Sequence, residues 1–266
     1  MKKHLSLIII IIFISCEKEI EVDINDSLAS IVIEANVSTV LNNSKVSISK
    51  SLNLSDPLPY PTISDAIVTI TDNTNNEIYT LSETEAGLYI HSTLQGIEGH
   101  SYTLSVTIDS TIYIANSTIP QLVELEYLEQ VGEVTNHGGD GPGSGFNDTT
   151  IAEVIPIYND PSEYTNYYQF VVTRNNSILG DVFVQSDYAF NGLENSRSLF
   201  IESEIGDQLT IDMQGIDKDV YEYLLGLNEV INQTSATPTN PISNLSNNAL
   251  GYFKAHTFSE KLITIQ

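Results

Sequence analysis

The stretch Ser101-Tyr-Thr-Leu-Ser-Val-Thr-Ile108 decides the fold, because apolar and polar side chains alternate along its whole length. Its even-numbered positions are apolar, and its odd-numbered positions are Ser or Thr. Successive side chains of a strand point to opposite faces, so a period of two residues indicates a strand with one buried face. We therefore expect a β-strand whose even positions, from Tyr102 to Ile108, face a hydrophobic core.

The same alternation recurs on both sides of this strand. It is found in residues 31–37, 46–48, 66–70 and 112–114, and the intervals between these runs are rich in the Asn, Asp, Gly and Ser residues that favour turns. Short strands with one apolar face each are buried against a second sheet, and about seven of them suit an Ig-like β-sandwich. We expect residues 28–120 to form such a sandwich in a mainly β protein.

Strand patterns resume after residue 150. They cover residues 151–157, 167–173, 181–185, 198–202 and 208–213, with closing strands at 251–255 and 261–265. Residues 151–266 are therefore expected to form a second antiparallel β domain, either a sandwich or a barrel. One amphipathic helix is expected near residues 217–232, with Asp217 as its N-cap and an apolar stripe that includes Val220 and Leu224 packed on the second sheet.

Aromatic residues are concentrated in the first part of this second domain. They are Tyr164, Tyr167, Tyr168, Phe170, Phe183, Tyr188 and Phe190. Such a set can stack on sugar rings, or it can be the ordinary packing of a sheet. Because the chain contains no Trp, packing is the favoured interpretation.

The N-terminal segment has the pattern of a bacterial lipoprotein signal. A basic start, Lys2 and Lys3, precedes an apolar run from Leu5 to Ile14 that is too short for a stop-transfer helix. Cys16, the single cysteine, follows Ser15 at the position where such a signal is cut and lipidated. We interpret residues 1–15 as the signal peptide, Cys16 as the lipidated residue and residues 16–27 as an acidic linker. The alternatives are an ordinary secretory signal with a stray cysteine and a short membrane anchor.

Charge and cysteine content exclude several functions. Ten Lys and Arg residues against 35 Asp and Glu give a net charge of −25. Without basic clusters, the chain is not suited to bind nucleic acid or anionic lipid headgroups. With Cys16 lipidated, no thiol remains for a disulfide, a cysteine zinc site or a thiol nucleophile.

A glycine-rich segment separates the two expected domains. Residues 121–150 are interpreted as a linker, and the run from His137 to Asp148 as a flexible loop. Asp140, Asn147 and Asp148, with His137, are candidate metal ligands. Because the alternating ligands and closing Glu of an EF-hand loop are missing, a solvated loop is favoured. No Lys-Ser/Thr follows the glycines, so the run is not a phosphate-binding loop.

Two resemblances extend this interpretation. The A-x-V-x-I run at 66–70, the G-x-Y at 87–89 and the G-x-x-Y-x-L-x-V at 99–106 resemble carboxypeptidase-regulatory and transthyretin-like sandwiches. The whole mature chain resembles the Bacteroidota lipoproteins grouped as domain of unknown function 4249, through Cys16 and its acidic linker, the sandwich motif, Tyr167-Tyr168 and the tail at 240–253. That resemblance implies an accessory role beside TonB-dependent outer-membrane receptors, and it implies no catalytic residues.

The sequence lacks a recognisable catalytic constellation. Its five histidines are scattered, and no H-E-x-x-H, G-x-S-x-G or P-loop motif occurs. We expect a non-catalytic outer-membrane lipoprotein without cofactors, anchored by its lipid and working with a TonB-dependent receptor on an unknown ligand. Exposure at the cell surface is favoured, and a periplasmic orientation is the alternative. The alternatives are a structural or adhesive surface lipoprotein and, third, a hydrolase.

Overall fold

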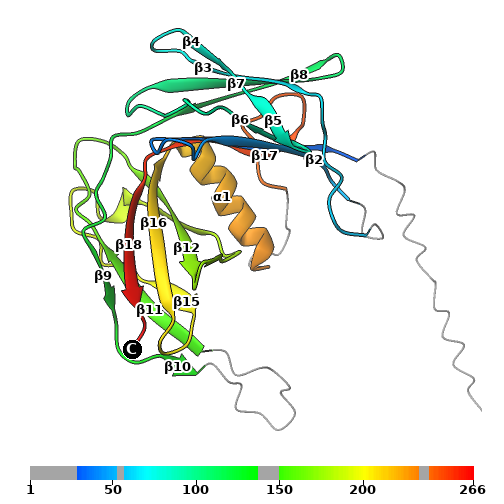
Figure 1. Ribbon diagram of the computed structural model, residues 1–266. Coiled ribbons are helices and arrows are strands. Elements are labelled where there is room, and N and C mark those ends of the chain that lie inside the picture. Colours follow the sequence, from blue (N-terminus) through cyan, green and yellow to red (C-terminus); the bar gives the residue numbers. More distant parts are fainter. Residues whose placement is uncertain (1–28, 53–56, 137–149, 234–239) are drawn as a thin grey trace, which may run out of the picture.

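The computed structural model describes residues 29–52, 57–136, 150–233 and 240–266. These described residues form two β-sandwiches with one long helix packed against both (Figure 1). The mainly β architecture expected from the alternating pattern is confirmed. Cys16 and the metal-ligand candidates His137, Asp140, Asn147 and Asp148 lie outside the described residues.

The first sandwich packs a five-stranded sheet on a four-stranded sheet. The five-stranded sheet has the order β17 (Leu250–His256), β1 (Ile31–Ser38), β2 (Lys45–Lys50), β6 (Leu88–Ile90) and β5 (Ser82–Glu85). The four-stranded sheet has the order β4 (Glu77–Thr80), β3 (Ile67–Asp72), β7 (Ser101–Ile108) and β8 (Thr111–Thr118). In β7, Tyr102, Leu104 and Val106 are buried in the core between the sheets, as their alternation predicted.

The second sandwich has its own core. One sheet contains β10 (Thr135–Asn136), β11 (Thr150–Ile157) and β15 (Leu199–Glu202), with β9 (Tyr127–Gln130) also paired to β11. The other contains β13 (Ser177–Ile178), β12 (Tyr167–Arg174), β16 (Gln208–Ile216) and β18 (Ser259–Thr264), with β14 (Phe183–Ser186) also paired to β12. A short 3₁₀ turn, Asp187–Ala189, follows β14. Of the two arrangements the sequence left open, the structure has the sandwich.

Strand β17 differs from expectation. The sequence placed Gly251–Ala255 among the closing strands of the second domain, but β17 pairs in parallel with β1 at the edge of the first sandwich. Its apolar side chains explain the placement, because Phe253 and Ala255 are fully buried in the first core. A parallel pair needs a crossover, and here the crossover contains the second sandwich. The first sandwich is therefore built from both ends of the described chain.

Helix α1 (Lys218–Ile231) begins where the sequence predicted. Asp217 caps it, accepting a hydrogen bond from the Val220 backbone N–H at 3.0 Å. The same carboxylate accepts hydrogen bonds from the Ser117 hydroxyl and the Thr118 backbone N–H of β8. The apolar stripe contacts β12 and β14 of the second sandwich as expected, and it also contacts β17. The helix therefore joins the two sandwiches.

Candidate functional site

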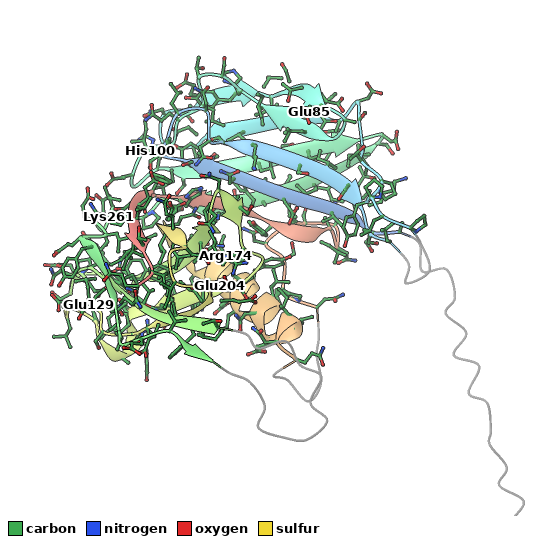
Figure 2. The ribbon with its side chains drawn as sticks, turned by 60° about the horizontal axis from the view of Figure 1, so that its bottom comes forward. Glu85, His100, Glu129, Arg174, Glu204 and Lys261 are labelled. Carbon is green, nitrogen blue, oxygen red and sulfur yellow. The ribbon has the colours of Figure 1, made fainter. Side chains whose placement is uncertain are left out.

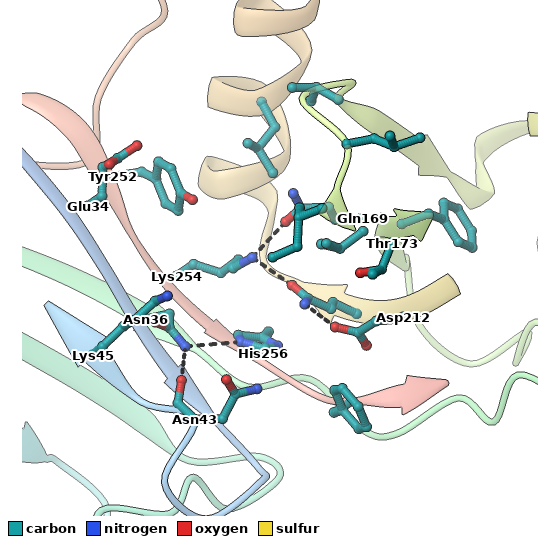
Figure 3. A pocket seen from close by; sticks show the side chains of 18 of the residues that line it. Glu34, Asn36, Asn43, Lys45, Gln169, Thr173, Asp212, Tyr252, Lys254 and His256 are labelled. Carbon is teal, nitrogen blue, oxygen red and sulfur yellow. Dashed lines mark hydrogen bonds between the residues drawn. The ribbon is translucent and has the colours of Figure 1, made fainter. Parts of the chain in front are cut away.

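A cavity of about 770 Å³ lies where the two sandwiches face each other. One wall is the outer face of β17, β1 and β2, and the opposite wall is the outer face of β12, β16 and β18, with α1 alongside (Figure 3). Alternation places polar side chains here, since Phe253 and Ala255 turn into the core while Tyr252, Lys254 and His256 turn out. We call this cavity the cleft.

Lys254 crosses the cleft from the first wall to the second. Its Nζ donates hydrogen bonds to Gln169 Oε1 at 2.7 Å and to Gln214 Oε1 at 2.6 Å (Figure 3). Although lysine is normally a surface residue, this side chain is only 6% exposed. Burial lowers the pKa of the Lys254 ammonium to about 8, and the nearby Asp212 charge opposes the change. Neutral amides, rather than a carboxylate, thus accept its hydrogen bonds.

Asp212 carries the complementary charge on the second wall. Gln214 Nε2 donates to one carboxylate oxygen, so Gln214 bridges Asp212 and Lys254. The other oxygen, Oδ1, is buried and has no hydrogen-bond partner within the described chain. Burial raises the pKa of Asp212 to about 6, despite the hydrogen bond from Gln214 and the charge of Lys254. A buried acceptor without a partner is costly unless a ligand or water supplies a donor.

His256 is buried at the end of β17, the strand that carries Lys254. Its Nδ1 lies 2.8 Å from the Thr257 carbonyl oxygen, and its Nε2 lies 3.4 Å from Asn36 Nδ2. Because the carbonyl only accepts and the amide nitrogen only donates, these contacts fit a neutral imidazole protonated at Nδ1. Burial, followed by the charge of Lys254, lowers the pKa of His256 to about 3. This imidazole is therefore uncharged at neutral pH.

The burial of His256 predicts a specific acid sensitivity. Its pKa falls from an ordinary 6.5 to about 3 on folding, so between these values the unfolded chain binds the proton and the folded chain does not. The stability contributed by His256 is thus complete above pH 6.5 and is lost as the pH falls toward 3, at up to about 1.4 kcal/mol per pH unit. We expect the unfolding free energy of the native chain minus that of His256→Gln to fall by about 3 kcal/mol between pH 6.5 and pH 4.

Urea unfolding at several pH values measures this difference. Circular dichroism is the suitable signal, because the chain has no Trp for fluorescence. His91→Gln is the matched control, since His91 lies in the first sandwich, beside the Tyr79 ring, and outside the cleft. A native-minus-variant difference for His256→Gln that stays flat across this pH range would contradict the buried neutral imidazole.

The described histidines do not gather into one site. His100 lies in the first sandwich (Figure 2), where its Nδ1 is 2.7 Å from Asp72 Oδ2. The hydrogen bond from His100 contributes to lowering the pKa of Asp72 against the opposing effect of burial. No group of three or more His, Cys, Asp or Glu side chains in the described ranges is arranged to hold a metal ion.

The aromatic residues noted in the sequence serve several purposes. Tyr168 and Phe170 are buried in the second core, and the Tyr168 ring lies 4.9 Å from that of Tyr158. Tyr167 instead points to α1, with its ring 4.9 Å from that of Tyr221, whereas Tyr188 is 95% exposed. Packing is therefore the role of the buried members, and the set does not form one platform.

Sequence reasoning did not single out the polar network of the cleft. Lys254, Gln169, Gln214 and Asp212 belong to three strands and carry no local motif. The one available signal is in β17, where Lys254 and His256 share an alternating face beside the buried Phe253. None of the helices in the described segments has the length and apolar character needed to cross a membrane.

The solved structures that this chain resembles are only distantly similar to it, whereas its family is clear. Among curated proteins, none matches this chain. A two-domain fibronectin type III segment of chicken tenascin is 10% identical, over 71% of this chain and 92% of that one, with a TM-score of 0.22. The FN1–FN3 domains of chicken CNTN1 are 15% identical, over 70% of this chain and 57% of that one, with a TM-score of 0.24. The profile of the family described as "Domain of unknown function (DUF4249)" matches residues 17–261, and the chain therefore belongs to that family.

Proposed function

We propose that this protein is a non-catalytic binding module of the outer membrane, anchored by a lipid on Cys16 and working beside a TonB-dependent uptake receptor. The observation that carries the binding role is the cleft of about 770 Å³. Small-molecule sites have volumes of about 300–1,000 Å³ and combine apolar walls with a few fixed polar groups. The apolar side chains of α1, the buried side chain of Lys254 and the buried Oδ1 of the partly exposed Asp212 give the cleft that character.

The anchoring part of the proposal rests on the N-terminal sequence. Lys2 and Lys3, the apolar run to Ile14 and Cys16 have the order of a lipoprotein signal, and the acidic residues after Cys16 resemble an export tag for the cell surface. The net charge of −25 suits a soluble domain held at a membrane only by its lipid, because anionic headgroups repel it. The receptor partner comes from the family resemblance.

Co-purification tests the receptor partnership. We expect the tagged full-length protein, extracted in mild detergent, to retain a TonB-dependent receptor in stoichiometric amount. A tagged outer-membrane lipoprotein of similar abundance and unrelated sequence is the control bait. If the receptor is absent from the preparation, or is retained equally by the control bait, the accessory role is wrong.

A hydrolase is the second candidate, and one observation favours it. Asp212 and Glu260 both line the cleft, and the raised pKa of Asp212 suits a general acid. However, the two residues are register partners on neighbouring strands β16 and β18, so they lie on the same wall. A glycosidase needs its two carboxylates to flank the bond that is cut. Binding without turnover is therefore the function that this arrangement supports better.

A further inference from the structure

Charges of both signs line the cleft. Lys254, Lys45 and Glu34 lie on the first wall, Asp212 and Glu260 lie on the second, and Asp181 lines the cleft from the segment after β13. Lys254 is the most deeply buried of these charges, and it repels a cation that enters. The carboxylates of the opposite wall repel an anion in the same way. An uncharged ligand avoids both costs.

The unused hydrogen-bonding capacity specifies the polar groups of that ligand. Lys254 has three N–H donors, and two of them are used by Gln169 and Gln214. Asp212 Oδ1 is buried and makes no well-formed hydrogen bond within the described residues, although the Ser259 backbone N–H is near enough to help lower the pKa of this carboxyl. A ligand would therefore have to supply an acceptor for Lys254 and a donor for Asp212. The side chain of Gln214 lies between these two positions. A hydroxyl group both donates and accepts, so a pair of neighbouring hydroxyls matches both needs.

Other side chains that line the cleft can also form hydrogen bonds with hydroxyl groups. Amide and hydroxyl side chains outnumber the buried charges, and they include Asn36, Asn43, Ser47, Thr173 and Thr210. The Tyr252 ring lines the first wall beside Lys254, whose Nζ is 6.0 Å from the ring centroid (Figure 3). An aromatic face beside planar amides suits a molecule with one apolar C–H face and a rim of hydroxyls.

We propose that the cleft binds a neutral sugar, with Asp212 accepting from one ring hydroxyl and Lys254 donating to another. This inference rests on the proposed role as a binding module and names the ligand class of that module. A free amino acid, which carries both charges, is the main competitor. It is disfavoured because neutral amides and hydroxyls outnumber the charged side chains of the lining, and because Gln214 already partly satisfies both Lys254 and Asp212.

The test uses the full lipidated chain and a defined set of probes. The protein is purified in a detergent without a sugar headgroup, because maltoside or glucoside micelles would compete for the cleft. Thermal shift and titration calorimetry are then measured with glucose, galactose, mannose, xylose, N-acetylglucosamine, maltose, cellobiose and lactose. Glycine, phosphate and putrescine represent zwitterions, anions and cations. We expect at least one sugar to raise Tm and to give a measurable Kd, and the three charged probes to have no effect.

Variants locate the binding in the cleft. We expect Asp212→Asn to weaken the sugar that binds best by at least about tenfold, because the charge-assisted acceptor is lost. Thr173→Trp fills the cleft from β12 without touching the polar network and is expected to abolish binding, so the test does not depend on one substitution. Asp109→Asn, an exposed change of the same type in the β7–β8 turn, is the matched control and should leave Kd unchanged.

The outcomes separate this inference from the proposed function. The sugar assignment is overturned if none of the eight sugars binds, if only glycine or a charged probe binds, or if sugar binding survives both Asp212→Asn and Thr173→Trp. Circular dichroism confirms that each variant is folded before it is scored. The receptor is absent from this assay, so sugar binding without receptor co-purification would refute the partnership alone. Receptor co-purification without sugar binding would refute the ligand alone.

Discussion

Gly251→Ala is expected to destabilise the protein by about 4 kcal/mol or more, which is a large part of the roughly 5–15 kcal/mol that holds a domain folded. Gly251 has a φ of +94°, a region that other residues rarely adopt. It lies directly against β1, where an added Cβ would overlap the Ile33 carbonyl oxygen and lie 2.8 Å from its carbon. Both atoms are backbone, so the clash is relieved only if β17 moves away from β1.

Gly206→Ala separates the two causes of this loss of stability, which are the backbone strain at positive φ and the clash of the added Cβ with β1. Gly206 has nearly the same φ, +96°, but nothing lies within 4 Å of an added Cβ. It should therefore cost only the backbone strain, about 1–3 kcal/mol. The excess cost of Gly251→Ala in urea unfolding measures the close approach of β17 to β1. Equal costs for the two substitutions would contradict the tight parallel pairing.

Cys16→Ala is expected to remove the protein from the outer membrane altogether. Each buried CH₂ of an acyl chain contributes about 0.8 kcal/mol, and one chain alone binds a membrane only reversibly, with an association constant of about 10⁴ M⁻¹. A diacylglyceryl cysteine with a third, amide-linked chain makes release negligible, and loss of the sulfur removes this anchor. We expect the variant to incorporate no labelled palmitate and to be absent from the outer-membrane fraction.

The control for this experiment is Ser6→Ala, a small change in the apolar run that leaves Cys16 in place. It should be labelled and should fractionate like the native protein. Separating inner from outer membrane matters, because an uncut signal segment could retain the Cys16→Ala chain at the inner membrane. If the variant reaches the outer membrane in the native amount, lipidation of Cys16 is not the anchor.

Local pattern was enough to predict the elements of this fold. The even positions of residues 101–108 are buried in β7, except for the partly buried Ile108, and the stripe containing Val220 and Leu224 is buried beneath α1. Asp217 was recognisable as an N-cap because its side chain satisfies an N–H within three residues. These features depend on neighbours in the sequence, which a single sequence displays directly.

The cleft depends on distant neighbours, and so the sequence could not reveal it. Lys254 is 85 positions from Gln169 and 40 positions from Gln214. Each of these residues occupies the outward face of its strand, where polar side chains normally meet water and need no partner. Only the placement of one sandwich against the other buries them. Because β17 was expected in the second domain, the wall that carries Lys254 and His256 could not be assembled from pattern alone.

The parallel pairing of β1 with β17 also determines when this protein can fold. A chain that emerges from its N-terminus presents β1 long before β17, since Asn36 and His256, which contact each other across this pair, are 220 positions apart. Contacts this distant in sequence form late, because a long loop must close first. The first sandwich therefore lacks an edge strand and the core side chain of Phe253 until the last part of the chain arrives. A chain truncated before residue 250 would lose β17 from one wall of the cleft and β18 from the other, and it would expose an unpaired edge on β1, where other chains could add and aggregate.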